Sequence, residues 1–285
     1  MSYYIFDPIQ FKEFGYHFYQ GVNFYYRYQQ HKKLFFKNIY IPYGPNCQTK
    51  ESFLQFLDHI ENFRLAKITI DLPAVYSQKR IKEIYSLLKK HKYKRIPYIH
   101  QDEETILLFK NTFRLKSKKM IKVRYGHKFC NIAVKKELND KDIDDIYKIY
   151  LGSAKRIGFP PKEKTAFKKL SQKCLVSLAY GKTTNVIEGY VFGYLCDFNE
   201  VNLIQKENIK VLFVMFTGLN NEGRKHRLGH SIHYELFNTA FQNYGIDIID
   251  FHGASRTKNR SYVAFKREWG GEFYSLPGSF QKVKF

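Results

Sequence analysis

Lysine and arginine side chains gather in the C-terminal stretch from Asp247 to Gly278, DIIDFHGASRTKNRSYVAFKREWGGEFYSLPG. The stretch opens as a buried strand that ends near the carboxylate of Asp250, and it continues into a short helix that carries Lys266. Such a helix places a long cationic side chain at the edge of a sheet, where open α/β sheets bind ligands. Fixed positive charge there can stabilise an anionic ligand or a negative charge that develops during a reaction.

Other kinds of site find less support in the residue pattern. The four cysteines are widely spaced, with no CxxC pair, and we expect them to be small core residues. The histidine-rich segment HRLGHSIH lies across an expected helix start and lacks a carboxylate at helical spacing, so we expect no metal site and no permanently bound cofactor. No Ser-His-Asp or Cys-His arrangement for nucleophilic catalysis is evident.

Length and composition indicate a globular chain with two domains. The 285 residues exceed the usual size of one domain, and no apolar run is long enough for a membrane span. The N-terminus lacks the basic and apolar regions of a secretion signal, so we expect a cytoplasmic protein. A net charge of +22 favours a polyanionic partner, although the abundance of Lys, Ile, Phe, Tyr and Asn also fits codon bias in an AT-rich genome.

The hydrophobic periodicity predicts the same order of elements in both halves of the chain. Strands are expected at 23–29, 34–44, 66–73, 94–101 and 104–110, and then at 129–135, 174–181, 187–196, 209–218, 246–251 and 272–278. Helices are expected at 50–63, 77–93, 139–158, 162–173, 229–244 and 259–269, with Asn139 as an N-cap and Gly158 as a stop. Both halves contain β-β-α-β-α-β.

The shared order predicts an α/β (α+β) chain with two tandem domains, each a mixed sheet flanked by helices. We place the first domain at 1–115 and the second at 116–276, with the boundary in the basic connector 111–128. The C-terminal tail, 277–285, is expected to pack on the first domain.

Four segments, in order, carry a family resemblance. IYIPYGP (Ile39–Pro45) is similar to a strand end, KSKKMIKVRYGHKFCNIAV to a basic helix between domains, and DIDDIYKIYLGSAKRIGF (Asp142–Phe159) to an acidic helix. DFHGASRTKNRSYVAFKREWGGE is similar to a closing Asp-Phe-Gly-Gly … Phe-Lys-x-x-Phe-Gly-Gly, with His252 and Trp269 as departures. Together these segments resemble the FemABX (Fem) family, dual-GNAT aminoacyltransferases of peptidoglycan cross-bridge synthesis. The resemblance implies two tandem GNAT-like domains.

The resemblance also implies a reaction and its partners. An amine of a UDP-linked or lipid-linked muropeptide would attack the ester carbonyl of aminoacyl-tRNA, in the cytoplasm and with a peripheral contact to the inner face of the membrane. A Fem-like GNAT enzyme that uses acyl-CoA on another envelope or polysaccharide amine is the alternative. A non-catalytic RNA- or nucleotide-binding protein is the alternative from another class.

Seven residues are predicted to act on substrate. The family's Phe-Lys pair falls on Phe265 and Lys266, so that Lys266 would contact acyl or phosphate oxygens; the competing interpretation is a solvated helical face. Asp250 either accepts a proton or is a strand-end carboxylate satisfied by backbone N–H groups. Arg156 either binds the acceptor or complements its helix C-terminus. The other predicted substrate-binding residues are Tyr43, which could instead simply set a turn, Tyr150 and Arg256.

Two further groups of cations are predicted to bind phosphate or tRNA. Lys118, Lys122 and Arg124 belong to the connector helix, which is otherwise a solvated linker. Arg224 and Arg227 lie in or beside the loop HRLGHS, which precedes the helix at 229–244. In CoA-dependent GNAT enzymes the corresponding loop holds the pyrophosphate, but only Gly229 fits that pattern plainly, so the loop weakens CoA without excluding it.

Overall fold

The computed structural model describes residues 17–21, 24–33, 35–41, 45–47, 49–72, 78–97, 104–115, 117–200, 207–254, 260–275 and 277–285. Tyr43 and Arg256, two of the predicted substrate-binding residues, lie outside these ranges. The chain forms two compact units. The first comprises Met1–Thr105, Phe198–Asn208 and Tyr274–Phe285, and the second comprises Ile106–Asp197 and Ile209–Phe273.

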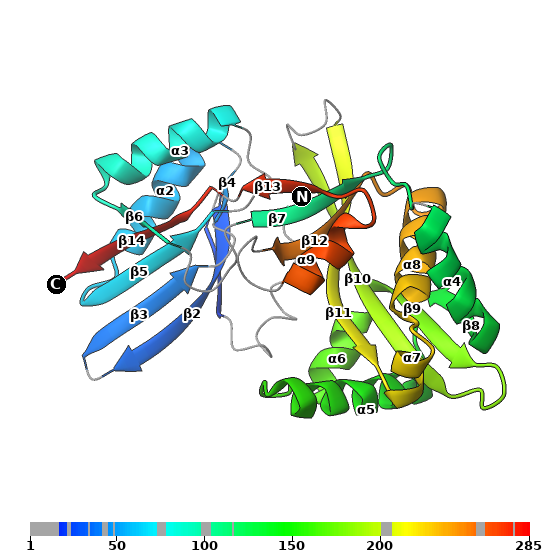
Figure 1. The fold of residues 1–285 in the computed structure, drawn as a ribbon. Coiled ribbons are helices and arrows are strands. Elements are labelled where there is room, and N and C mark those ends of the chain that lie inside the picture. The colour runs from blue at the N-terminus through cyan, green and yellow to red at the C-terminus, as the bar shows by residue number, and fades with distance from the viewer. Residues whose placement is uncertain are drawn as a thin grey trace. The chain divides into compact units, whose positions relative to one another are not determined.

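The first unit is built on a mixed sheet with the strand order β1-β2-β3-β5-β14-β6. β3 and β5 are parallel, whereas β14, from the end of the chain, runs antiparallel to β5 and β6. The helices α2 (Lys50–Glu61) and α3 (Gln78–Lys90) lie together along the sheet (Figure 1). The strands are β1 (His17–Gln20), β2 (Phe24–Lys33), β3 (Phe36–Ile41), β4 (Asn46–Cys47, paired to β2), β5 (Ala66–Asp71), β6 (Lys94–Ile96) and β14 (Ser279–Lys284).

The second unit is built on a sheet with the order β13-β7-β12-β11-β10-β9-β8. Its strands are β7 (Glu104–Phe109), β8 (Cys130–Lys135), β9 (Cys174–Gly181), β10 (Ile187–Glu200), β11 (Glu207–Leu219), β12 (Ile248–Ala254) and β13 (Glu272–Ser275). Its helices are α4 (Ser117–Phe129), α5 (Asp140–Ile157), α6 (Lys164–Ser171), α7 (Asn221–Lys225), α8 (Gly229–Asn243) and α9 (Arg260–Arg267). β8, β9 and β10 are antiparallel, and β11 and β12 are parallel.

Helices cover both faces of the second sheet. On one face, Leu175 and Ala179 of β9 belong to the core that α8 fills, and α4 lies beside α8 (Figure 1). On the other face, Phe192 of β10 meets Phe167 of α6, with ring centroids 5.7 Å apart, and α6 lies next to α5. The two-residue period of β9 therefore divides its side chains between two apolar layers.

The α/β class is confirmed, and each expected helix and strand has a counterpart, although the strand expected at 94–101 is described only over Lys94–Ile96 and the elements β1, β4, α7 and β14 were not expected. The ends of α5 follow their local signals. The Asn139 side chain accepts a hydrogen bond from the backbone N–H of Asp142 at 2.7 Å, which caps the helix. Gly158 ends it with φ 85°, a left-handed conformation in which a side chain is strained. Both units also contain a β-α-β step with parallel strands, β3-α2-β5 and β11-α8-β12, as the shared element order predicted.

β7 belongs to the second unit and not, as predicted, to the first domain. Residues 104–110 were assigned by sequence order to the first domain, which was placed at 1–115, but β7 is a neighbour of β12 in the second sheet. Ile106 and Leu108 of this strand are fully buried in the core against α8. Alternating apolar residues show that a strand has a buried face, but they do not show which sheet buries it.

Gly270 turns the chain after α9 in a conformation that favours glycine. Its φ is +87°, and a Cβ atom there would lie 2.7 Å from the carbonyl oxygen of Thr112. We expect Gly270→Ala to lower the free energy of unfolding by at least about 1–2 kcal/mol, because alanine is strained at positive φ and also displaces the backbone. Denaturant unfolding measures the change.

The matched control is Gly152→Ala in α5, where an added Cβ meets nothing within 4 Å. Alanine is a better helix former than glycine, so the free energy of unfolding of this variant should be roughly 0.5–1 kcal/mol higher than that of the wild type. A Gly270→Ala protein as stable as the Gly152→Ala protein would contradict the turn described here.

Candidate active site

The candidate site lies in the second unit, where the parallel strands β11 and β12 stop pairing. Among the described residues, pairing runs from Val211 with Ile248 to Phe213 with Asp250. β11 continues to Leu219, and β12 leads into α9. Ligands bind at such carboxyl ends in open α/β sheets, so the side chains around Asp250 and the end of β11 define the candidate site.

The side chains of β11 change faces just beyond this point. Leu212 and Val214 pack in the core that α8 fills. Phe216 should share their face, but its ring lies 6.0 Å from that of Tyr150 in α5. Thr217 then faces α8 again. The alternation of faces along β11 is therefore interrupted by one residue between Val214 and Thr217.

Thr217 and the buried His233 of α8 form a hydroxyl–imidazole pair. His233 Nδ1 lies 2.7 Å from the carbonyl oxygen of Gly229, so Nδ1 carries the proton and donates it. In the neutral ring Nε2 is then an acceptor, and it lies 3.3 Å from Oγ1 of Thr217, whose side chain is exposed. The Thr217 hydroxyl therefore donates to Nε2 of His233, which fixes the direction of the hydroxyl at the end of β11. The sequence reasoning missed His233 because it weighed this histidine-rich segment only as a metal site.

The burial of His233 predicts that acid destabilises the fold. Burial lowers the pKa of His233 to about 4 from its ordinary 6.5, and the neighbouring His230 adds to the shift. Below about pH 6.5 the unfolded chain therefore binds a proton that the folded chain does not, and stability falls towards pH 4. At about pH 5 the expected loss relative to neutral pH is roughly 2 kcal/mol, at about 1.4 kcal/mol per pH unit.

Urea unfolding of wild type and His233→Gln at neutral pH and at about pH 5 measures this loss. The variant should show a smaller difference between the two pH values. His31→Gln, which changes an exposed histidine of β2, should keep the wild-type difference. An unchanged pH dependence in His233→Gln would contradict the assignment.

The two residues predicted to be catalytic are both buried. Lys266 is 1% exposed and Asp250 is 6% exposed. Lys266 therefore does not lie on a solvated helical face, whereas its neighbour Arg267 is exposed, with its guanidinium 5.7 Å from the ring centroid of Phe273. Lysine is almost never fully buried unless its charge is compensated, because moving the ammonium group out of water costs free energy. The burial of Lys266 therefore lowers the stability of the fold unless other groups compensate its charge.

Aromatic rings hold α9 against α8 around the candidate site. The Phe265 ring lies 5.0 Å from that of His233 and 5.1 Å from that of His230, in edge-on geometry. Trp269 is fully buried and lies 5.1 Å from Phe237. Phe265, predicted to bind substrate, thus packs directly on the histidine that pairs with Thr217.

Comparisons with solved structures find this architecture in other proteins. A crystal structure of FemX aligns over 97% of this chain and 90% of its own, with a TM-score of 0.72 and 13% identity. The chain has a Fem-like fold. The C-terminal domain of a putative lysylphosphatidylglycerol synthetase from Agrobacterium fabrum aligns over 97% of this chain and 86% of its own, with a TM-score of 0.66 and 10% identity.

A tandem GNAT protein from the clavulanic acid biosynthesis pathway also aligns, over 92% of this chain and 79% of its own, with a TM-score of 0.50 and 9% identity. No protein-family model matches the sequence, and the curated proteins contain no match to it. The expected tandem GNAT-like architecture is thus confirmed at the level of the fold.

Within the Fem-like fold, two predicted substrate-binding residues lie on α5, apart from α9. Tyr150 is buried, with its ring 4.4 Å from that of Phe167, and its hydroxyl accepts a hydrogen bond from the backbone N–H of Lys162. Its ring also lies 6.0 Å from that of Phe216 in β11, so Tyr150 has the surroundings of a core residue. Arg156 is exposed in the last turn of α5.

Of the three predicted phosphate-binding cations of α4, one is paired with a carboxylate and two are exposed. Lys122 lies 3.7 Å from Glu268, which also bonds with Lys119 and, at 2.7 Å, with His230. Burial acts to raise the pKa of Glu268, but the hydrogen bonds of His230 and Lys119 outweigh it and the pKa is lowered. Lys118 and Arg124 are exposed and remain available to a polyanion.

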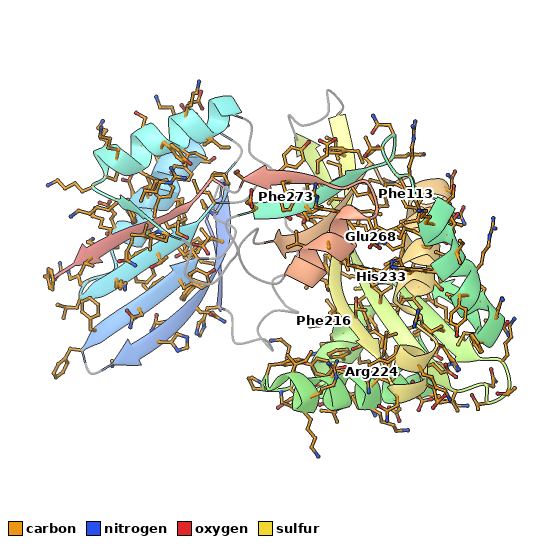
Figure 2. All side chains as sticks on the ribbon, viewed as in Figure 1. Phe113, Phe216, Arg224, His233, Glu268 and Phe273 are labelled. Carbon is orange, nitrogen blue, oxygen red and sulfur yellow. The ribbon has the colours of Figure 1, made fainter. Side chains whose placement is uncertain are left out.

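Arg224 and Arg227 lie at the α7–α8 corner. Arg224 is exposed and donates to the carbonyl oxygen of Leu219 at 2.8 Å. Figure 2 shows it at α7, whereas Glu268 and His233 lie close to α9 and α8. Arg227 is exposed with φ 54°. Phe265 of α9 thus packs on His233 of α8, with Lys266 next to it in the same helix and Asp250 in the preceding strand β12, whereas Arg156, Arg224 and Arg227 lie on α5 and at the α7–α8 corner. No described helix is long and apolar enough to cross a membrane.

Proposed function

We propose that this chain is an acyltransferase that moves an amino acid from aminoacyl-tRNA to an amine of a peptidoglycan precursor in the cytoplasm. One observation carries the proposal: a fully buried lysine, Lys266, stands where the sequence matches the Fem Phe-Lys pair, in a chain with a Fem-like fold. A buried cation beside a strand end is costly, and such positions concentrate at functional sites.

The reaction needs a cation and a proton acceptor. The amine nitrogen attacks the ester carbonyl carbon, a C–N bond forms, and the carbonyl electron pair moves onto oxygen. The Lys266 ammonium stabilises this oxyanion, a contribution of about 3–4 kcal/mol for one well-placed group. The C–O bond to the tRNA ribose then breaks, and the amine proton passes to the leaving oxygen through Asp250.

The tRNA would be attracted mainly by charge. The exposed cations of α4 include Lys118, Arg124 and Lys128, and the whole chain carries +22. Contacts between such cations and phosphates release counterions, so binding should weaken steeply as salt rises.

The similar structures suggest more than one class of acceptor. One similar structure is named as the C-terminal domain of a putative lysylphosphatidylglycerol synthetase, and another, with a TM-score of 0.64, as L-PGS from Bacillus licheniformis. An acceptor hydroxyl on an anionic lipid is therefore the second candidate, and the acyl-transfer chemistry at Lys266 would be the same.

A transfer assay tests the proposal. The full chain is incubated with tRNA carrying labelled amino acids and with either a UDP-linked muropeptide or phosphatidylglycerol vesicles. We expect label on the muropeptide amine. Label on the lipid would show that the acceptor is phosphatidylglycerol instead of the muropeptide. Thermal stabilisation by CoA without any effect of tRNA would show that the donor is acyl-CoA instead of aminoacyl-tRNA. RNA binding without transfer would favour a non-catalytic binding protein.

A further inference from the structure

Three side chains of metal-binding type meet at the far edge of the second unit, outside the candidate active site. Cys130 begins β8, Glu188 lies in β10, and His226 follows α7. The Sγ atom of Cys130 is 3.3 Å from Oε2 of Glu188, and Nδ1 of His226 is 2.8 Å from the same oxygen. All three ligand atoms lie within 4.8 Å of one another.

The local structure holds these three side chains in place. The ring of Phe129 stacks flat on that of His226, with centroids 4.3 Å apart and 4° between the planes. The backbone N–H of Asn220 donates to the carbonyl oxygen of Glu188 at 3.0 Å, which ties α7 to β10. A Cβ atom at Gly181 would lie 2.4 Å from Oε1 of Glu188, so this glycine leaves the space that the carboxylate fills.

The cluster is largely buried, and one of its three residues is partly exposed. Cys130 is 1% exposed and Glu188 is 5% exposed, whereas the side chain of His226 is 17% exposed. Burying a carboxylate is costly unless it is paired or binds a metal. His226 is thus the most exposed of the three residues.

We propose that Cys130, Glu188 and His226 bind a zinc ion. Thiolate, imidazole and carboxylate are the zinc ligands of proteins, at about 2.0–2.3 Å from the metal, so that neighbouring ligand atoms stand roughly 3.3–3.8 Å apart. The separation of 3.3 Å between Cys130 Sγ and Glu188 Oε2 is already in this range, whereas the hydrogen-bonded His226 Nδ1, at 2.8 Å from Oε2, would move away by about 0.5 Å when the ion enters. Zinc displaces the thiol proton of Cys130, and three protein ligands leave a fourth position for water.

A carboxylate stands behind the histidine ligand. With Nδ1 on the metal, the proton of His226 lies on Nε2, which is 3.9 Å from Oε2 of Glu222. This separation is longer than a hydrogen bond, so the Glu222 side chain would have to move closer to accept from the Nε2–H group, as carboxylates beside metal-binding histidines usually do. The backbone already joins the two residues, since the carbonyl oxygen of Glu222 accepts from the N–H of His226 at 2.8 Å.

Cobalt(II) titration of the full chain, stripped of metal and kept reduced, tests the site. We expect one cobalt per chain, with the charge-transfer absorption of a cobalt–thiolate bond and displacement by zinc. Zinc at about a hundredfold its Kd should also raise Tm on the order of 5 °C. No binding by the folded wild type would overturn the proposal and leave the three residues as a hydrogen-bonded cluster.

Variants locate the ligands. Cys130→Ser should abolish the charge-transfer band, and Glu188→Gln and His226→Gln should each weaken cobalt binding at least tenfold. The matched control is Cys174→Ser, which removes another fully buried thiol from the same sheet and should keep the band. If Cys130→Ser does not fold, cobalt binding by Glu188→Gln and His226→Gln tests the site instead. Undiminished cobalt binding in His226→Gln and Glu188→Gln would overturn the assignment.

Discussion

Lys266→Met is expected to lower the turnover number of aminoacyl transfer at least tenfold, and by roughly 100- to 1000-fold if Lys266 contacts the oxyanion directly. Methionine is unbranched like lysine and only one heavy atom shorter, so the change removes the charge of this fully buried side chain and leaves most of its volume filled. The loss should appear in kcat, with the KM of both substrates little changed, because the oxyanion exists only in the transition state.

Arg267→Met is the matched control for this experiment. Arg267 is the next residue of the same helix and has the same formal charge, but it is exposed. Its replacement should change kcat less than about twofold, as is usual for exposed charges that make no essential contact. Wild-type turnover in Lys266→Met, with the fold verified by its near-UV spectrum and Tm, would reject the catalytic role. An equal loss in both variants would point to the general charge of α9.

Trp269→Ala is expected to have the largest effect on stability, a loss of about 3–5 kcal/mol in the free energy of unfolding. Trp269 is fully buried between α8 and α9, with Phe237 at 5.1 Å, Phe265 at 5.8 Å and His230 at 5.9 Å between ring centroids. Alanine would leave a cavity there. Since Phe265 packs on the same ring, activity should fall as well.

Trp269→Phe should cost much less than Trp269→Ala. The Nε1–H group of Trp269 is buried without a hydrogen-bond partner among the described residues, which costs about 1–3 kcal/mol. Phenylalanine removes this group along with part of the apolar surface, and it restores the residue that the Fem resemblance has at this position. Denaturant unfolding of both variants measures the difference. Equal losses would show that the indole, and not simply an aromatic ring, is needed between the helices.

The elements of the second unit could be predicted because their signals are local. A strand period of two, a helix period of 3.6 and the caps of α5 at Asn139 and Gly158 each depend on neighbours within a few residues. The membership of strands in sheets is different. β7 and β14 lie far along the chain from their partners β12 and β5, and several pairings would bury their alternating apolar residues equally well.

The candidate active site was likewise predictable from the sequence only in part. Residue types and their order along the chain were enough to find the Fem resemblance, the pair Phe265–Lys266 and Asp250. Whether Lys266 was solvated or buried depended on how α9 packs on the core of the second unit.

Two other groupings became visible only in the folded chain. Thr217 is aimed at His233 because β11 shifts its side chains by one position. Cys130, Glu188 and His226 are separated by 58 and 38 residues and meet only when β8, β10 and α7 come together. A single sequence records which groups are present and what each segment prefers locally, whereas distances between remote groups are set by the packing of the whole unit.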